Sequence, residues 1–430
     1  MNVGIIGGSD GLGKTIIYYL KDDFDVFISA RNHKKGRDVA DGLGVKYIES
    51  NCELAELCDV LIISVPIHLT SSVIREVAPH MKKGSVMLDV TSVKEEPLKT
   101  MKESVPDWAE YIPTHPVFGP RTRDLDNQVI VLTADKKGEW YTKVYDYFKS
   151  KNMRIIQTSA SKHDFMMSIV QVLTHFSFIS TAYAIEKLNV ELEETEDYES
   201  PIYNLMIDMI ARIVSQNPYL TYYIQSMNNN GVNVRNTFAD AVCELRDVIN
   251  RGDDAGFIEI AESATNHMGD IKDALGRSDK AIGSLTYEFS YLKNSVGSEI
   301  GIMDIYSGEV YLGILEKINN KCAILNVDGE SKEFRLAGIR ILTRAELYEW
   351  KVENLKTIKY SVSVRFNSDV DSESIIGIVK ELYGIEEINL VREEHLDEGC
   401  VDLTFEIDAM YDSEFKNVKK MFKAFGGKIH

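Results

Sequence analysis

Short apolar runs recur along the first third of the chain, and segments of helical pattern separate them. The run at 2–8 ends in glycines and is followed by a helical pattern at 13–20 and a second run at 26–29. Later runs lie at 59–66 and 85–90. Apolar strands separated by helices are typical of a parallel sheet with helices on both faces. We therefore predict an α/β fold with a Rossmann-type parallel sheet, whose ligands bind beyond the carboxyl ends of the strands.

A longer apolar segment at 163–186 predicts a helix that is buried in a core or a subunit interface. Its polar exceptions are spaced by four, three and four residues, which places them on one stripe of a helix. They are Asp164, Ser168, Gln171 and His175. Buried polar groups need partners, so the stripe is either a satisfied network with a neighbouring helix or the wall of a polar ligand pocket.

A second apolar helix is predicted at 202–214, after an acidic stretch at 189–199 that we interpret as a solvated loop. Arg212 lies on its polar face, one turn after Asp208. The two could form a local ion pair; alternatively, a buried arginine binds a carboxylate ligand in bidentate fashion. Further amphipathic helix at 232–274 adds surface of the kind that forms a dimer core beside an active site.

The pattern changes near residue 300. Short alternating runs separated by turn signals predict a small all-β module, which we interpret as a structural spacer. Residues 358–429 predict strand, helix, strand, strand, helix and strand, the ferredoxin-like α+β order. The expected domains are a dinucleotide-binding Rossmann domain, an all-helical substrate and dimerisation domain, the β module and the ferredoxin-like domain, at 1–158, 159–292, 300–346 and 356–430.

Composition restricts the classes of function. The formal net charge of −19 argues against a nucleic-acid partner, because phosphate binding needs a basic face. It also means that local cations must hold any anionic ligand. No apolar run reaches the ~18 residues of a membrane span. The five cysteines show no CxxC spacing, which argues for a reducing cytoplasm and against structural zinc.

The glycine-rich turn after the first apolar run is the candidate nucleotide site. It comprises Gly7, Gly8, Ser9, Asp10, Gly11, Leu12 and Gly13. Glycines let the backbone approach a pyrophosphate, which the N-terminus of the next helix then binds. Asp10 departs from this pattern because it occupies the middle-glycine position, where a carboxylate would repel phosphate. Either Gly11 takes that role in a shifted loop, or nucleotide binding is weaker than usual.

Arg31 and Asn32 follow the second apolar run, where NAD-binding domains usually carry an acidic residue for the ribose hydroxyls. An arginine with lysines nearby suits a 2′-phosphate instead. We therefore predict NADP in preference to NAD; the alternative is a solvated basic turn. Val65 and Pro66, at the end of the run 59–66, complete the predicted cofactor contacts.

His115 is the candidate catalytic residue. It opens the sequence His-Pro-Val-Phe-Gly-Pro at 115–120, where the prolines restrict the backbone. We expect His115, like Pro66 and Ser92, just after a strand, so that all three gather at one edge of the sheet. A rigid histidine there suits an acid or a base, whereas the alternative is a purely structural turn.

Together these segments resemble the prephenate/arogenate dehydrogenases of tyrosine biosynthesis, especially their archaeal-type members, over about residues 1–285. The resemblance implies NAD(P)-dependent oxidation of prephenate, with loss of CO2, to 4-hydroxyphenylpyruvate, or of arogenate to tyrosine. The shared motifs are the opening Ile-Ile-Gly-Gly, Asp-Val-Thr-Ser-Val-Lys at 89–94, the His115 segment, His163-Asp164 with Leu-Thr-His-Phe at 173–176, and Ala-Arg-Ile at 211–213.

By motif, His115 corresponds to the histidine that takes the ring hydroxyl proton as hydride leaves the same carbon, and Ser92 to a serine that positions it. His175 and Arg212 correspond to substrate-binding groups, and Gln171 lies on the same stripe as His175. A neutral imidazole that accepts the proton relieves the positive charge built up by hydride departure. Prephenate is a dianion, for which Arg212 supplies a cation. Ring aromatisation drives the decarboxylation, so no metal is expected.

The C-terminal domain resembles ACT regulatory domains, which bind amino acids, and this implies tyrosine as an effector. The loop at 367–371 is acidic and lacks the usual glycine, which favours a purely associative role. The sequence thus predicts a cytoplasmic, homodimeric prephenate dehydrogenase that binds neither membrane nor nucleic acid. The alternatives are an arogenate dehydrogenase and a non-catalytic dinucleotide-sensing regulatory protein. Nucleotide binding without turnover would indicate the sensor.

Overall fold

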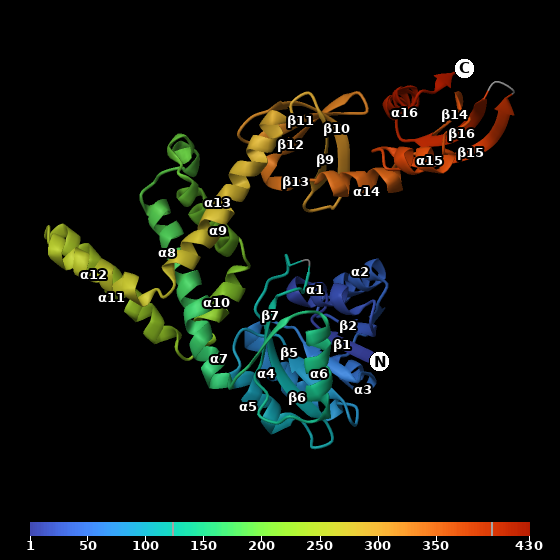
Figure 1. Ribbon diagram of the computed structural model, residues 1–430. Helices are drawn as coiled ribbons and strands as arrows, with labels where there is room; N and C mark the ends of the chain where they lie inside the picture. The colour runs from blue at the N-terminus through green and yellow to red at the C-terminus, as the bar shows by residue number, and fades with distance from the viewer. Residues whose placement is uncertain (123, 397–398) are drawn as a thin grey trace. The chain divides into compact units, whose positions relative to one another are not determined.

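The computed structural model describes residues 1–122, 124–396 and 399–430, which form two compact units, Met1–Ile271 and Lys272–His430. The first unit opens with an eight-stranded sheet of order β3-β2-β1-β4-β5-β6-β7-β8 (Figure 1). Its strands are β1 (Asn2–Ile6), β2 (Asp25–Ser29), β3 (Lys46–Tyr47), β4 (Val60–Ile63), β5 (Val86–Asp89), β6 (Glu110–Pro116), β7 (Val129–Leu132) and β8 (Arg154–Gln157). Its helices are α1 (Gly11–Leu20), α2 (His33–Leu43), α3 (Asn51–Leu57), α4 (Ile67–Val77), the 3-10 helix Ala78–His80, α5 (Glu95–Ser104) and α6 (Glu139–Ser150).

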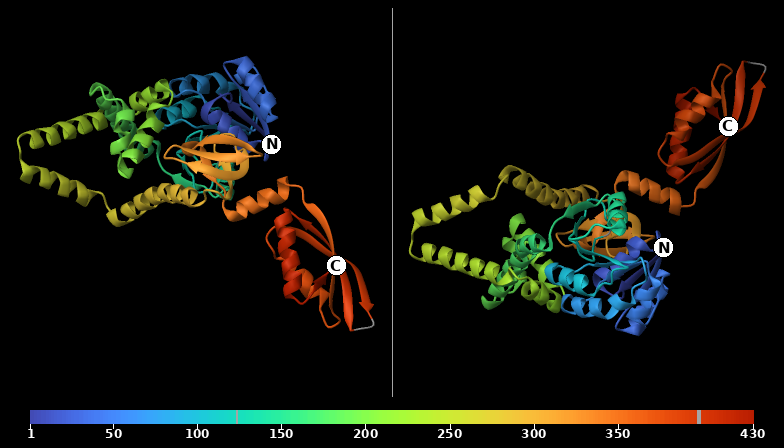
Figure 2. Two further views of the ribbon diagram at one scale, coloured as in Figure 1. Left: turned by 90° about the horizontal axis from the view of Figure 1, so that it is seen from above. Right: turned by 90° about the horizontal axis from the view of Figure 1, so that it is seen from below.

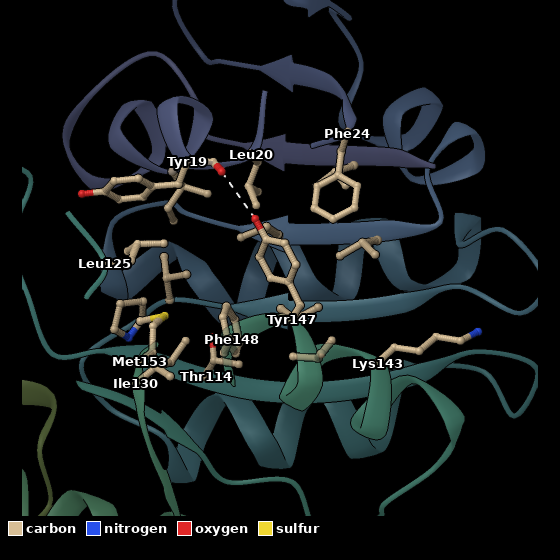
Figure 3. Close-up of a pocket in the computed structure, with 18 of the residues that line it drawn as sticks. Tyr19, Leu20, Phe24, Thr114, Leu125, Ile130, Lys143, Tyr147, Phe148 and Met153 are labelled. Carbon is tan, nitrogen blue, oxygen red and sulfur yellow. Dashed lines mark hydrogen bonds between the residues drawn. The ribbon is translucent and has the colours of Figure 1, made fainter. Parts of the chain in front are cut away.

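The predicted Rossmann-type sheet is confirmed, with one addition. β1 to β6 pair in parallel, whereas β7 pairs antiparallel to β6. The central strands are almost continuously apolar because helices cover both faces; Ile5, Ile28 and Ile63 are fully buried. On the face that carries α1 and α6, a largely apolar cavity of about 360 Å³ remains. Figure 3 shows Tyr147 of α6 donating a hydrogen bond of 3.4 Å to the backbone oxygen of Tyr19 of α1 across it.

The helical part of this unit follows directly. Its elements are α7 (Ala160–Met167), the π-helical segment Ser168–Leu173, α8 (Thr174–Lys187), the 3-10 helix Leu192–Tyr198, α9 (Pro201–Val214), α10 (Pro218–Met227), α11 (Gly231–Asn250) and α12 (Asp254–His267). The apolar helix predicted at 163–186 is therefore not one regular α-helix, because the π-helical segment interrupts it. Figures 1 and 2 show α11 and α12 projecting away from the sheet.

Burial of this apolar helix in a core or in a subunit interface was predicted; the core alternative does not hold for the single chain, and burial in a subunit interface stays a prediction. Phe165, Met166, Ile169 and Val170 are exposed. By length and composition alone, the run Ala160–Lys187 is apolar enough to cross a membrane. Its polar side chains nevertheless bond to the Rossmann part of the same unit, as described below. We therefore interpret this run as the central helix of the helical domain that follows the Rossmann domain.

The second unit contains two further sheets, of order β12-β11-β10-β9-β13 and β15-β16-β14-β17. The first forms the predicted β module, and the second, with its helices, has the predicted ferredoxin-like order. The bounds are α13 (Ile271–Asn294), β9 (Glu299–Asp304), β10 (Val310–Ile318), β11 (Cys322–Val327), β12 (Glu330–Arg335), the 3-10 helix Leu336–Gly338, β13 (Ile339–Ile341), α14 (Arg344–Asn354), β14 (Ile358–Asn367), α15 (Ser372–Lys380), β15 (Ile385–Leu396), β16 (Cys400–Ala409), α16 (Asp412–Ala424) and β17 (Lys428–Ile429).

Candidate active site

The turn between β1 and α1 is packed too tightly for side chains at two of its glycines. Gly7 has φ +89°, and a Cβ there would lie 2.1 Å from the carbonyl oxygen of Ser64. A Cβ on Gly13 would lie 2.4 Å from the carbonyl oxygen of Gly7. Glycine is therefore required at both positions. The result is a close backbone turn at the N-terminus of α1, which is the feature that a pyrophosphate needs.

Asp10, the departure from the glycine pattern, caps α1. Its backbone is extended, at φ −156°, and its carboxylate accepts a hydrogen bond of 2.8 Å from the backbone N–H of Gly11. Lys35 also donates to this carboxylate, at 2.5 Å. The Lys35 hydrogen bond holds the pKa of the exposed Asp10 carboxyl below its usual value, with the Gly11 N–H adding to the effect. Lys35 thus offsets the charge that would repel a phosphate.

The other predicted cofactor contacts lie on neighbouring turns at the same edge of the sheet. Arg31 is exposed between β2 and α2, and Asn32 caps α2 by accepting from the backbone N–H of Lys35 at 3.0 Å. Val65 and Pro66 lie between β4 and α4. The chain therefore presents a glycine turn, a helix N-terminus and exposed cations together, and these residues fit a dinucleotide. Gly8, Ser9, Gly11 and Leu12 lie on the β1–α1 turn and at the start of α1.

His115 lies within β6, not after it as the sequence suggested, because β7 extends the pairing of this strand. His115 is opposite Val131 of β7. Side chains alternate across a strand, and its neighbours Thr114 and Pro116 line the apolar cavity under α1 and α6. His115 therefore points to the opposite face of the sheet, where it is 2% exposed.

On that face, a chain of three buried side chains links the two parts of the unit. His115 Nδ1 lies 2.9 Å from His163 Nε2, and His163 Nδ1 lies 2.7 Å from Asp164 Oδ1. The Asp164 carboxylate also accepts from the backbone N–H groups of Lys94, at 2.7 Å, and Glu95, at 2.9 Å. α5 has no side-chain cap of its own at Lys94. Asp164 therefore ties the start of α5 to α7.

A buried ion pair supports the strand that carries His115. Lys94 Nζ donates to the Asp89 carboxylate, to the hydroxyl of Thr91 at 3.2 Å and to the carbonyl of Thr114 at 2.6 Å. Burial lowers the Lys94 pKa, and Asp89 opposes that shift. These contacts fix the backbone next to His115 in place.

Both candidate histidines favour the neutral form. Burial, together with the neighbouring His163 and Lys94, holds the pKa of His115 well below its usual value. Burial also lowers the pKa of His175, whose Nδ1 is buried without a hydrogen-bond partner among the described residues. A neutral imidazole can accept a proton. The site can therefore perform base chemistry near neutral pH.

Two of the other predicted substrate residues, Ser92 and Gln171, lie near the junction of the two parts. Ser92 is half-buried beside Val93, which packs in one apolar cluster with Val172, the neighbour of Gln171. The Gln171 Oε1 atom is buried without a partner among the described residues. The His115 partner in the structure is His163 rather than Ser92.

Arg212, on α9, differs from its prediction. It is exposed rather than buried in the single chain. Among the residues that the structure describes, it forms no ion pair, so the predicted alternative of a pair with Asp208 is wrong here. An exposed, unpaired arginine on an apolar helix remains available to an anionic ligand.

The sequence alone missed the direct contact that His163 makes with His115. From the sequence, His163 and Asp164 were identified only as part of a family motif, and Asp164 also as part of a polar stripe. The signal that could have found them is the pair of adjacent polar residues at the start of an apolar helix. Their partners lie 48 and about 70 positions away in the sequence, and only the fold reveals them.

A Rossmann sheet with a glycine turn, next to a helical domain that contacts a buried neutral histidine, is the arrangement of a dinucleotide-dependent dehydrogenase. Residues 18–157 match the family described as prephenate dehydrogenase, nucleotide-binding domain, and residues 159–263 match prephenate dehydrogenase, dimerization domain. A probable arogenate/prephenate dehydrogenase of Methanocaldococcus jannaschii is 39% identical over all of this chain and 98% of its own length. The chain therefore belongs to the prephenate/arogenate dehydrogenase family.

Other relatives cover less of the chain. The T-protein of Haemophilus influenzae is 30% identical over 50% of this chain and 56% of its own length. A crystal structure of prephenate dehydrogenase from A. aeolicus, in complex with hydroxyphenyl propionate and NAD+, covers 63% of this chain and 98% of its own, with a TM-score of 0.52 at 16% identity. At that identity, the likeness supports the fold alone.

Proposed function

We propose that this chain is an NAD(P)-dependent prephenate dehydrogenase with His115 as its general base. The observation that carries this proposal is the placement of His115, a buried neutral imidazole at the carboxyl edge of a nucleotide-binding sheet. One ring nitrogen of His115 is held by His163. No protein hydrogen bond to the other, Nε2, is formed among the described residues, which leaves it for a substrate hydroxyl.

A bound NAD(P) would supply the acceptor for the hydride that leaves the ring carbon. The β1–α1 turn and the N-terminus of α1 would hold its pyrophosphate, and Arg31 with Lys35 would favour a 2′-phosphate. His115 takes the hydroxyl proton as the hydride departs. The bond between the ring and its carboxylate then breaks, and CO2 leaves. The electron pair of that bond aromatises the ring, and the proton returns to the oxygen. Hydride, CO2 and the phenol account for every atom and charge of the substrate.

Substrate binding is assigned to the helical domain. Prephenate carries two carboxylates, and Arg212 supplies an exposed cation in a protein of net charge −19. His175 and Gln171 offer buried polar atoms without protein partners among the described residues. Buried polar groups of this kind are commonly satisfied by a ligand or by water, and we assign them, with Ser92, to contacts around the substrate ring.

We further propose that the active protein is a cytoplasmic homodimer built on the helical domain. The support is the match to a dimerization domain and the exposed apolar side chains on α7 and α9. The ferredoxin-like domain is assigned an associative role, because its acidic 367–371 loop is poorly suited to an amino-acid effector.

Product analysis tests the proposal. Purified protein is incubated with prephenate or arogenate, each with NADP or NAD, and the reduced cofactor and the organic product are quantified. We expect one equivalent of 4-hydroxyphenylpyruvate per reduced cofactor, with NADP preferred. Tyrosine formed from arogenate alone would replace the proposed substrate. Nucleotide binding without any product would indicate a sensor, and equal rates with the two cofactors would refute the role of Arg31.

A further inference from the structure

The buried hydrogen bonds of His163 and Asp164 link two parts of the unit, and they also bear on which nitrogen of His115 carries hydrogen. Asp164 is 2% exposed, the backbone N–H groups of Lys94 and Glu95 donate to its carboxylate, and His163 Nδ1 lies within hydrogen-bond distance of it. The Asp164 carbonyl oxygen also accepts from the side chain of Asn228, at 2.7 Å. These contacts leave Asp164 little freedom to move.

The donors around Asp164 decide which nitrogen of His163 carries hydrogen. An ionised carboxylate only accepts hydrogen bonds, and it lies at the N-terminus of α5, where negative charge is favoured. His163 Nδ1, 2.7 Å from Asp164 Oδ1, must therefore donate. In a neutral imidazole the other nitrogen is then an acceptor. His163 thus presents the lone pair of Nε2 to its next neighbour.

That neighbour is His115, whose Nδ1 lies 2.9 Å from His163 Nε2. A hydrogen bond between an acceptor and this nitrogen requires the hydrogen to sit on His115 Nδ1. His115 Nε2 is then unprotonated and faces away from His163. The nitrogen that the proposed reaction needs as a base is therefore free.

We propose that His163 and Asp164 are positioning residues that set the tautomer of His115, with His115 Nε2 as the proton acceptor. The proposal rests on the proposed role of His115 as base. The bond made by one ring nitrogen fixes the state of the other. The same chain supports the imidazolium that forms when His115 takes the proton, because His163 accepts from the charged ring and Asp164 orients His163.

Two substitutions of His163 separate this role from packing. His163→Leu replaces the imidazole with an apolar side chain of similar volume and so removes the acceptor for His115 Nδ1–H. His163→Gln restores an acceptor, because the amide oxygen can replace Nε2. We expect His163→Leu to lower kcat by about 100-fold with little change in KM for the cofactor. His163→Gln should stay within about 10-fold of the wild type. Equal loss in both variants would overturn the proposal.

A spectroscopic measurement reads the tautomer directly and needs no turnover. The protein is labelled with ¹⁵N at its nine histidines, and the His115 signals are identified by their loss in His115→Asn. In the wild type near neutral pH, Nδ1 should have the shift of a protonated nitrogen and Nε2 that of an unprotonated one. His163→Gln should keep this pattern. Hydrogen on Nε2 in the wild type would overturn the proposal, even if His163→Leu fails to fold.

The two readouts also separate this proposal from the proposed function. If neither prephenate nor arogenate is oxidised, the proposed function fails, but the wild-type ¹⁵N pattern still decides the tautomer. If substrate is oxidised while Nε2 carries hydrogen, the dehydrogenase reaction stands, but the role of His115 Nε2 as base fails and His163 and Asp164 return to a purely structural role.

Discussion

Burial keeps His115 in the charge state that its proposed role requires. A free histidine with a pKa of about 6.5 would be partly protonated near pH 6, and a protonated imidazole accepts no proton. In the structure, burial, His163 and Lys94 all lower the pKa of His115. The sequence could suggest a base at this position. It could not show that the fold would keep this base neutral at lower pH.

The pH dependence of the free enzyme follows from that shift. The neutral base is present above the His115 pKa and is lost as pH falls through it. Because that pKa is well below 6.5 in the folded protein, kcat/KM should remain nearly constant from pH 8 to about 6 and fall only below that. Initial rates over this range, with enzyme-free blanks at each pH, measure the profile. An acid limb centred at 6.5 or above would contradict the buried, neutral state.

At the scale of the elements, β1, β2, β4 and β5 were predictable because buried parallel strands are continuous apolar runs, whereas β3, β7 and β8 were not predicted. The ferredoxin-like order was predictable for a similar reason, since alternating strands and amphipathic helices have clear periods. β9 was missed, although Ile300 and Ile302 are both buried. α14 was also missed, although Thr343 and Glu346 form a capping box at its start.

The rest of the site could not be predicted from periodicity. The π-helical segment Ser168–Leu173 changes the helical register between Asp164 and His175, so a stripe drawn at 100° per residue is only approximate there. Such segments often occur at functional sites. The contact of His163 with His115 depends on the antiparallel extension of β6 by β7, which sets the face on which His115 lies. Neither feature leaves a pattern in the local sequence.

The face of α9 provides the clearest test of substrate binding. Arg212→Ala should raise KM for prephenate by about 10-fold or more, because a carboxylate partner is lost, while kcat changes less. Arg246→Ala is the matched control, since Arg246 is an exposed arginine of the same domain that pairs with Asp247. Steady-state kinetics at saturating cofactor measure both. Equal KM values for the wild type and Arg212→Ala would remove Arg212 from the site.

At the scale of the whole molecule, two features have opposite effects on whether two chains associate. The net charge of −19 favours separate, soluble chains. The exposed apolar residues on α7 and α9, among them Phe165, Ile202, Met206 and Met209, favour association through that surface. Exposed large apolar side chains of this kind often mark an interface, so we expect association to prevail.

Light scattering after size-exclusion chromatography tests this expectation. The wild type should have twice the chain mass of 48.6 kDa. The double change Met206→Glu and Met209→Glu should shift the protein toward a monomer, because charge would be buried at the interface. Ile314→Glu, at an exposed apolar residue of β10, serves as the control and should leave the mass unchanged. A wild type that remains monomeric at micromolar concentration would refute the proposed dimer.

The measurement that tests the central claim most directly is the turnover of His115→Asn with prephenate, followed at 340 nm, together with its affinity for NADP. Asparagine keeps a polar side chain but provides no base at neutral pH. We predict that kcat falls by about 100-fold or more while cofactor affinity is unchanged. Near-normal turnover would show that another group takes the proton and would contradict the assignment of His115.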